Sequence, residues 1–434
     1  RLEHTGASVP PDKDLDCHSL WAAWGMTVHI IGAGLAGLSA AVRLSDRGQP
    51  VVVHEAAAHG GGRCRSFYDE TLERRIDNGN HMLLSGNKQA MAYLRAIGAH
   101  HSLYQPEQAA FPFLDFENGA RWLVRPGFKA LPDASLMDYL SVLKLAWASE
   151  NATVADIFNT NRPVFRNFWQ PFCVSVLNTP LEVASARLMW PVIQQTFGRG
   201  AAACRPGIAK QGLSESFIDP ALSLLEKRGV PVHFNQRLRA INFVGERAGG
   251  LSFADEDIAP DADDTVILAV PAETAATLIE DLNPPEKFRA IVNGHFLLPA
   301  PSRNISFFGL VGGVSQWLFV RDDVASVTVS AADDLAGESA GDIAKILWAE
   351  VCSALQLGEV PLGRHRIIKE KRATIEQSPG QVRLRLETRT RWDNLLLAGD
   401  WTQTGLPATI EGAITSGHRA AEIILKGRSG PSAI

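Results

Sequence analysis

The spacing of hydrophobic residues near the start of the chain predicts a strand, a helix and a second strand in close succession. Residues 27–31 and 51–53 are short runs rich in β-branched residues. Between them, apolar side chains recur at the spacing of one helix face, at Leu35, Leu38, Val42 and Leu44. Gly48 follows this segment and is suited to end the helix. Short strands that alternate with an amphipathic helix are typical of a parallel sheet with crossover helices.

Later segments show two further strand patterns. Residues 264–271 and 395–397 are mostly continuous apolar runs, as expected of buried strands, whereas residues 304–332 alternate between apolar and polar. Alternation of this kind is typical of an antiparallel sheet with one covered face. Together the patterns predict an α/β protein with a Rossmann-like domain and a second α+β domain that carries the antiparallel sheet.

Two helical segments are open to more than one interpretation. Residues 165–191 are rich in aromatic side chains, and residues 131–150 follow a helical pattern. One face of the latter carries Leu136, Leu140, Leu143 and Trp147. For both segments, packing within their own domain is the simpler explanation. If the substrate is a lipid, the alternatives are a membrane-docking face and a tunnel lined by aromatic rings.

Composition narrows the class of protein without identifying it. The chain has 434 residues, 46% of them hydrophobic and 21% charged, which is ordinary for a globular protein of two or three domains. A net charge of -5 gives no electrostatic footprint for nucleic acid. The five cysteines share no metal-type spacing, and they favour a reducing, cytoplasmic compartment. No apolar run approaches the roughly 18 residues of a spanning helix.

The six residues 32–37, with the sequence GAGLAG, join the first strand to the helix. Each glycine has a physical task in a dinucleotide-binding turn. Gly32 permits the tight turn, Gly34 lets the backbone approach a pyrophosphate, and Gly37 lets the helix pack close to the strand. A strand before the turn and a helix after it make this a strong indication of a bound dinucleotide.

The helix that follows the turn begins near Leu35 and Ala36. Its free N–H groups and positive dipole end would face the phosphates. Glu55 lies at the end of the second strand, roughly 20 residues beyond the glycines, where a carboxylate can accept hydrogen bonds from ribose hydroxyls.

A second glycine turn extends this unit, because Gly61 and Gly62 precede Arg63. The extension resembles the second half of the FAD-binding pattern in the amine oxidase and phytoene desaturase superfamily. A flexible surface loop is the plainer alternative. The resemblance implies that the dinucleotide is FAD, that Arg63 faces its diphosphate or the flavin edge, and that the backbone near Leu238 lies beside the adenine.

The last motif in this resemblance is the strand at 395–397, which is followed by Gly399 and Asp400. Asp400 would accept hydrogen bonds from the ribityl chain. A helix then begins around Thr409 and Ile410, and its N-terminus would stabilise negative charge on the reduced flavin.

His81 is the candidate catalytic residue. It ends the turn at 76–81, which in the superfamily runs close to the flavin ring. Histidine can donate a proton near neutral pH, although an isolated histidine is more often structural. In the narrower family that the sequence resembles, described next, glutamine is usual before this histidine. Asn80 replaces it here, so the role of His81 rests on the position of the loop.

Several segments resemble one family in particular, the hydroxysqualene dehydroxylases. They are residues 309–313, 316–317, 369–374 and 398–412, and the resemblance extends from Met26 to Leu425. It implies reductive removal of the allylic hydroxyl of hydroxysqualene, a long-chain isoprenoid, to give squalene in hopanoid biosynthesis. Reduced FAD would supply the hydride, no metal is needed, and the electron donor is not identified.

The same resemblance implies a domain division. Residues 26–110, 205–280 and 386–430 would form a discontinuous FAD-binding domain, and 111–204 and 281–385 the substrate-binding domain. Residues 1–25 are expected to be a leader or upstream segment. A hydrocarbon substrate further implies peripheral contact with the inner face of the cytoplasmic membrane.

Two other functions compete with this one. A carotenoid-type desaturase would share the fold and FAD but take hydride from its substrate. A non-catalytic prenyl-lipid binding protein would share only the fold, and the intact glycine turns, Glu55 and Asp400 argue against it.

Overall fold

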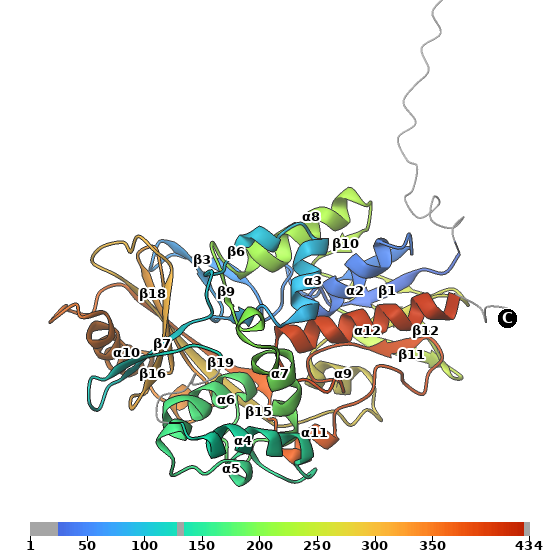
Figure 1. Ribbon diagram of the computed structural model, residues 1–434. Coiled ribbons are helices and arrows are strands. Elements are labelled where there is room, and N and C mark those ends of the chain that lie inside the picture. Colours follow the sequence, from blue (N-terminus) through green and yellow to red (C-terminus); the bar gives the residue numbers. More distant parts are fainter. Residues whose placement is uncertain (1–24, 128–133, 429–434) are drawn as a thin grey trace, which may run out of the picture.

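The computed structural model describes residues 25–127 and 134–428, which form two regions built on separate sheets (Figure 1). Apart from Gly25, the expected leader lies outside the described residues. Within these ranges no helix is long and apolar enough to cross a bilayer.

The first region is built on a five-stranded parallel sheet with the order β10-β2-β1-β14-β20. The predicted strands of this sheet are confirmed, and its central residues are fully buried. In chain order the strands are β1 (Val28–Ile31), β2 (Val51–His54), β10 (Val232–His233), β14 (Thr265–Leu268) and β20 (Leu395–Leu397).

Both faces of the parallel sheet are covered, which explains why its strands are apolar throughout. One face packs against α2 (Leu35–Ser45), α8 (Asp219–Lys227) and α12 (Ile410–Arg428). The other face packs against α9 (Ala272–Leu278) and a small antiparallel sheet. The strands of that sheet are β11 (Ala240–Val244), β12 (Arg247–Ser252) and β13 (Asp257–Ile258).

Helices α2 and α12 lie side by side although they come from opposite ends of the chain (Figure 1). A Cβ at Gly417 would clash with the carbonyl oxygen of Ala36, so the two helices cross at a distance that glycine permits. Glu411 of α12 accepts hydrogen bonds from the backbone N–H groups of Gln89 and Ala90, in the first turn of α3 (Lys88–Ala96). The C-terminal helix therefore completes the N-terminal region.

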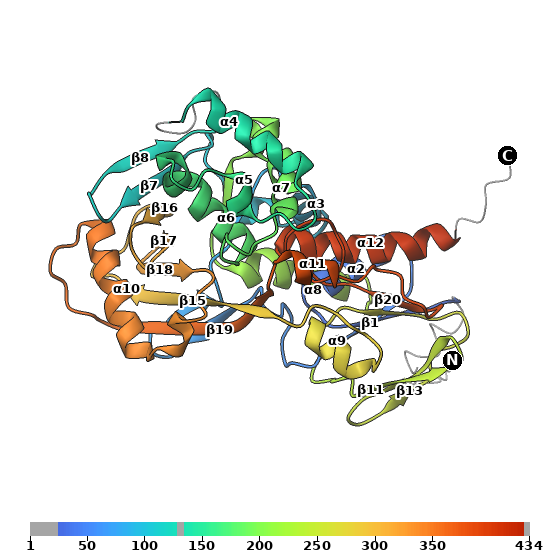
Figure 2. The ribbon, with the colours of Figure 1, turned by 90° about the horizontal axis from the view of Figure 1, so that it is seen from below.

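The second region is built on a seven-stranded sheet with the order β19-β15-β18-β17-β16-β7-β8. Its strands pair antiparallel, except that β16 runs parallel to β7. Helix α10 (Ala340–Leu355) lies along one side of this sheet (Figure 2). The strands are β7 (Phe111–Asp115), β8 (Arg121–Val124), β15 (Phe288–Leu297), β16 (Ser306–Val311), β17 (Trp317–Arg321), β18 (Val324–Val329) and β19 (His365–Ile375).

A group of short helices packs against β7, β16 and β17 through the predicted aromatic segment. Its rings are buried among one another, as in the stacked pair Phe168 and Phe172, and none of them lines the cavity described below. The packing interpretation therefore holds for this segment. The helices are α4 (Leu136–Leu143), α5 (Val154–Ile157), α6 (Gln170–Leu177), α7 (Met189–Gln195) and α11 (Pro379–Arg383).

The other helical segment packs on its own domain through Val142 and Leu145, but not through the apolar face identified from the sequence. It forms α4 followed by a 3-10 turn at Lys144–Trp147, and Leu140, Leu143 and Trp147 are exposed. The side chain of Leu136 lies outside the described residues.

Five short strands form two further small sheets, with the orders β3-β4 and β5-β9-β6. They are β3 (Ser66–Asp69), β4 (Arg74–Asp77), β5 (Met82–Leu84), β6 (Leu103–Tyr104) and β9 (Pro206–Ala209).

Candidate cofactor and substrate site

A cavity of about 540 Å³ lies between the carboxyl ends of the parallel strands and one face of the seven-stranded sheet. Ligands of open α/β sheets bind at this end of the strands. The cavity brings together fourteen of the fifteen predicted site residues: Gly32, Gly34, Leu35, Ala36, Glu55, Gly61, Gly62, Arg63, His81, Leu238, Gly399, Asp400, Thr409 and Ile410. The fifteenth, Gly37, lies behind the turn.

The glycine turns leave one edge of the cavity free of side chains. A Cβ at Gly34 would meet nothing within 4 Å, and Gly62 lies beside it, with its Cβ position 3.8 Å from the Gly34 Cα. By contrast, a Cβ at Gly32 would lie 2.5 Å from the carbonyl oxygen of Ala269, and one at Gly37 would clash with the Gly32 carbonyl. Gly32 and Gly37 therefore allow the backbone to pack closely at these two positions. Gly34 and Gly62 leave a backbone edge without side chains, which fits a diphosphate.

Glu55 holds the first glycine turn in shape. Its carboxylate accepts hydrogen bonds from the backbone N–H groups of Ala33 at 2.7 Å and Ala57 at 2.8 Å. A carboxylate has about four acceptor positions, so two remain for a ligand in the cavity that Glu55 lines. The predicted contact with ribose stays compatible with this arrangement.

Arg63 joins three parts of the site. Its guanidinium donates to the Asp400 carboxylate at 2.6 Å and to the carbonyl oxygen of Ala373 on β19, also at 2.6 Å. The Asp400 charge raises the pKa of Arg63, so the arginine stays cationic at the cavity wall. The second glycine turn is thereby tied both to the end of β20 and to the sheet of the other region.

Arg385 is a residue that the sequence analysis missed. It is only 4% exposed, and it donates to the carbonyl oxygens of Asp400, Thr402 and Leu406. Burial lowers the pKa of Arg385 to about 10, yet the side chain remains charged at neutral pH. It fixes the loop that carries Asp400. No local sequence pattern predicts this contact, because Arg385 lies 15 residues before Asp400, whose carbonyl oxygen it binds.

His81 lies where two cavities meet. It lines the main cavity and also a small one of about 20 Å³ that Asp77 and Arg321 border. His81 is accessible through the cavity. Desolvation by the surrounding protein lowers the pKa of its imidazole, the Asp77 charge raises it, and the Arg63 charge lowers it further. The net direction is downward, so the imidazole is mostly neutral at pH 7 and gains its proton at lower pH than an ordinary histidine.

Asn293 of β15 and Thr328 of β18 also line the main cavity and were not predicted. Their signal in the sequence is weak, since each strand also carries other polar residues, His295 on β15 and Ser326 on β18, and nothing local marks Asn293 or Thr328.

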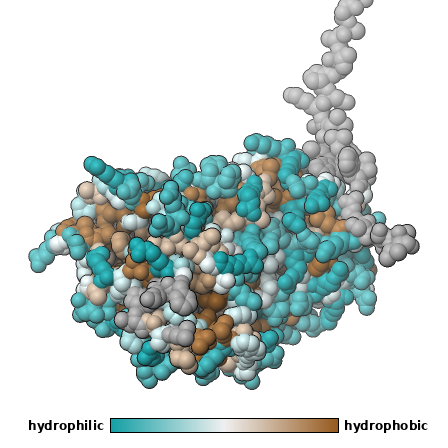
Figure 3. All heavy atoms as spheres, in the orientation of Figure 1, coloured by the Kyte–Doolittle hydropathy of each residue, from teal (hydrophilic) through white to brown (hydrophobic). Residues whose placement is uncertain are grey.

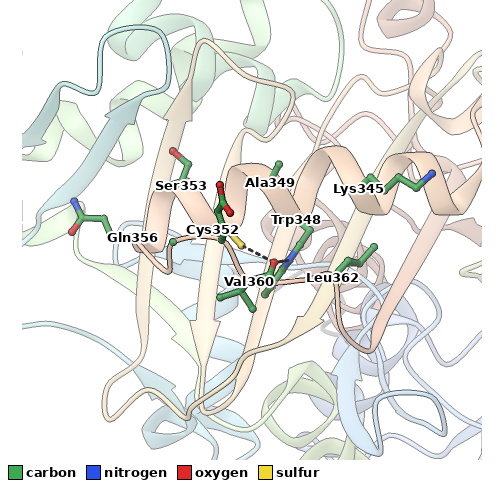
Figure 4. Close-up of a pocket in the computed structure, with 10 residues that line it drawn as sticks. Lys345, Trp348, Ala349, Cys352, Ser353, Gln356, Val360 and Leu362 are labelled. Atoms are coloured by element: carbon green, nitrogen blue, oxygen red, sulfur yellow. Dashed lines mark hydrogen bonds between the residues drawn. The ribbon is translucent and has the colours of Figure 1, made fainter.

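A second cavity, of about 590 Å³, lies over α10 (Figure 4). The Trp348 indole N–H that borders it donates to the carbonyl oxygen of Val360 at 2.8 Å and is already satisfied. None of the predicted site residues lines this cavity. The predicted site residues therefore make the cavity between the two sheets the candidate functional site.

The chain is similar in sequence and in fold to known oxidoreductases. The sequence pattern of the family described as flavin containing amine oxidoreductase matches residues 35–300 and 320–425. The hydroxysqualene dehydroxylase of Rhodopseudomonas palustris is 42% identical over 411 residues, which cover 92% of this chain and 98% of that protein. A probable zeta-carotene desaturase of Synechococcus elongatus is 24% identical over 487 residues, or 93% of this chain and 99% of that protein. Among solved structures, an oxidoreductase from Methanosarcina mazei is similar with a TM-score of 0.67 at 17% identity, covering 92% of this chain and 100% of that one.

These similarities carry different weight. At 17% identity the structural likeness shows the fold alone. The dehydroxylase shares far more identity with this chain than the desaturase does, over nearly the full length of both proteins. The chain therefore belongs to the flavin containing amine oxidoreductases and, within them, to the hydroxysqualene dehydroxylase family.

Proposed function

We propose that this chain removes the hydroxyl group of hydroxysqualene to give squalene, with FAD as its cofactor. The observation that carries the proposal is the 42% identity to a hydroxysqualene dehydroxylase over 98% of that protein. Bound FAD, in its reduced form, supplies the two electrons and one hydrogen that replace the hydroxyl. One proton must also reach the leaving oxygen, which departs as water.

The residues of the cavity wall have distinct tasks in this proposal. The bare edge at Gly34 and Gly62 and the N-terminus of α2 bind the diphosphate, and Glu55 binds ribose. Arg63 and Asp400 hold the part of the cofactor nearest the sheet. The wall beside the nucleotide is completed by Leu35, Ala36, Gly61 and Leu238. The N-terminus of α12 reaches the flavin side of the cavity through Gly399, Thr409 and Ile410.

We assign the proton transfer to His81. An allylic C–O bond breaks readily only when the oxygen leaves as water, so a proton donor has to lie beside it. The lowered pKa makes protonated His81 a stronger acid than an ordinary imidazolium, and the nearby Asp77 charge favours its reprotonation. The cost is that fewer molecules carry the proton at neutral pH.

We keep the domain division that the family resemblance implies. The cofactor-binding domain consists of residues 26–110, 205–280 and 386–430, and the substrate-binding domain consists of residues 111–204 and 281–385. The cavity is the place where segments of both sets meet.

We also propose that α4 and the turn after it dock on a lipid bilayer, at the inner face of the cytoplasmic membrane. Met137 is 71% exposed and Trp147 is 80% exposed, with Leu140 and Leu143 between them. Figure 3 shows hydrophobic side chains gathered on the lower part of the molecule, where Figure 1 places α4. A poorly soluble hydrocarbon substrate would be collected at such a surface.

The helix is held firmly in this position. Ser135 and Asp138 form a capping box at its N-terminus, and Asp138 also pairs with Arg162 at 2.8 Å. Val142 and Leu145 are buried on the inner side. The apolar side chains thus point outward from a fixed helix.

A bilayer fits this surface better than a second copy of the chain. Met137, Leu140, Leu143 and Trp147 form a small apolar face, whereas a stable protein interface buries roughly 800 Å² on each partner. Partial insertion of a few apolar side chains, with Trp at the interface, is sufficient for reversible membrane binding.

The experiment that tests the reaction is anaerobic incubation of the reduced holoenzyme with hydroxysqualene, followed by identification of the product. Squalene is the expected product, formed in step with reoxidation of the flavin. A more unsaturated polyene formed only by the oxidised enzyme would support a desaturase instead. Unchanged substrate with a fully reduced, folded enzyme would contradict the proposal.

A further inference from the structure

One face of the seven-stranded sheet carries a buried polar stripe, made of Asn293 and His295 on β15 and Thr328 and Ser326 on β18. The strands pair so that Asn293 lies opposite Thr328 and His295 lies opposite Ser326. Asn293 and His295 are each 1% exposed, and Ser326 and Thr328 are each 8% exposed. Burial of polar side chains costs stability unless hydrogen bonds compensate for it, so the stripe needs a physical explanation.

The residues that alternate with this stripe on the same two strands are apolar. Val292, Phe296 and Val327 face the other way and pack in the apolar core beneath α10. The polar stripe is therefore confined to the face that looks toward the cavity between the two sheets.

Hydrogen bonds connect the stripe to the loop that carries His81. The Thr328 hydroxyl donates to Asn293 Oδ1 at 2.8 Å and accepts from Asn80 Nδ2 at 3.0 Å. Asn293 Nδ2 in turn donates to the carbonyl oxygen of Asn78 at 3.3 Å. The loop approaches closely, because a Cβ at Gly79 would lie only 3.2 Å from Asn293 Nδ2.

Asn80, His81, Asn293 and Thr328 all line the main cavity. Next to them, β15 contributes Phe288 and Ile291 to the same wall. This part of the cavity thus presents one compact group of amide and hydroxyl groups beside an apolar wall. A long hydrocarbon with a single hydroxyl has the complementary pattern.

We propose that Asn80, Thr328 and Asn293 recognise the hydroxyl of the substrate and hold its C–O bond beside His81. This inference rests on the proposed function and adds the residues that distinguish substrate from product. The Thr328 oxygen keeps one unused acceptor position, and each Asn amide has capacity beyond the bonds described, so a substrate hydroxyl can both donate and accept there. Squalene, which lacks the oxygen, would leave these groups unpaired and bind more weakly.

The test compares the binding of hydroxysqualene and squalene to the oxidised holoenzyme, which has no electrons for the reaction. Each ligand is titrated in detergent, and the change in flavin absorbance or fluorescence gives its Kd. The wild type should bind hydroxysqualene roughly tenfold more tightly than squalene, as expected for one additional hydrogen-bonded group. Thr328→Val, which preserves the shape of the side chain, should bring this ratio close to one without weakening the binding of squalene.

Three further variants separate recognition from a structural effect. Thr328→Ser keeps the hydroxyl and should keep the ratio. Ser330→Ala removes another buried hydroxyl, at the residue directly after β18 and outside the cavity lining, and should leave the ratio unchanged. Asn80→Ala removes the amide from the half-buried loop position, without altering the sheet, and should lower the ratio as Thr328→Val does.

The outcomes distinguish this inference from the proposed function. If Thr328→Val and Asn80→Ala, both folded and loaded with flavin, discriminate between the ligands as the wild type does, the recognition site is wrong while the reaction can still stand. If the wild type binds neither ligand and forms no squalene from hydroxysqualene after reduction, the proposed function itself fails, and the recognition site fails with it.

Discussion

Arg63 and Asp400 form an ion pair of 2.6 Å although they lie 337 residues apart in the sequence. The pair closes the cavity wall at the point where the second glycine turn meets the end of β20. Because Arg63 also binds the carbonyl oxygen of Ala373, the same contact links the wall to β19.

Replacing Asp400 with Asn should weaken the retention of FAD roughly tenfold, since the variant keeps the shape but loses the charge that orients Arg63. The measurement is the Kd for FAD on reconstitution of the apoprotein. Asp281→Asn is a matched control, because Asp281 pairs with Arg391 at 2.8 Å on the exposed surface. Equal FAD affinity in the two variants would show that the Arg63 pair has no part in the cofactor site.

Gly34→Val should produce a folded protein that does not retain flavin. The backbone at Gly34 is in an ordinary extended conformation and its Cβ position is open, so the side chain fits the polypeptide but fills the edge assigned to the diphosphate. Flavin content after gel filtration and the far-UV circular dichroism spectrum give the two readouts. Gly363→Val, at another open position, should keep both. Full flavin occupancy in the Gly34 variant would remove the turn from the binding site.

The rate of C–O cleavage should fall as the pH rises through the lowered pKa of His81. The protonated form is the donor, and desolvation by the surrounding protein shifts the loss of its proton to a pH below the ordinary value of 6.5. Single-turnover reoxidation of the flavin, measured across a pH series, reports this limb. His81→Ala should slow the reaction and abolish the limb while FAD stays bound, whereas His100→Ala, on the exposed surface, should do neither. An unchanged profile in the His81 variant would assign the proton to another group.

Turnover in deuterated water should give squalene with one deuterium at the former carbinol carbon. Hydrogen on reduced flavin exchanges with solvent, whereas hydrogen transferred directly from a nicotinamide carries the label of the nicotinamide. Mass spectrometry of the product distinguishes these routes. Unlabelled squalene, formed after complete flavin exchange, would rule out delivery from the flavin.

The protein should float with liposomes, and substitution of Leu140, Leu143 and Trp147 by Glu should abolish flotation, because charged side chains oppose insertion of the face into the bilayer. Ile346→Glu provides the control, since Ile346 is a 43% exposed apolar residue on α10. If the triple variant still floats, α4 is not the membrane-docking surface. If the wild type does not float, the membrane proposal is wrong.

The parts of the fold that depend on local spacing could be predicted from the sequence. The glycine turns, the strands around them and the start of α12 each follow from a few neighbouring residues. The family resemblance is likewise confirmed by the 42% identity. The assigned roles of His81 and of the cofactor-binding residues remain predictions until they are measured.

Other features depend on contacts between distant segments and could not be predicted. The polar stripe exists only because Asn293 and Thr328, 35 residues apart, face each other across two strands. Arg385 shows its role only once the loop around Thr402 folds over it. The exposure of the apolar face of α4 depends on which side the neighbouring helices cover, and the helical pattern does not show that Val142 and Leu145 are the residues that pack.

The sheet order has a consequence for the synthesis of the protein. Central strand β1 leaves the ribosome first, but β14 begins more than 200 residues later, and β20 and α12 are among the last elements made. Until then the apolar face of α2 lacks its α12 partner, and Asp400 has not been synthesised. Domains that depend on such distant pairings fold slowly and expose apolar surface meanwhile. A nascent chain cut short before residue 395 should therefore be a substrate for chaperones and proteases, and flavin should enter only the completed chain.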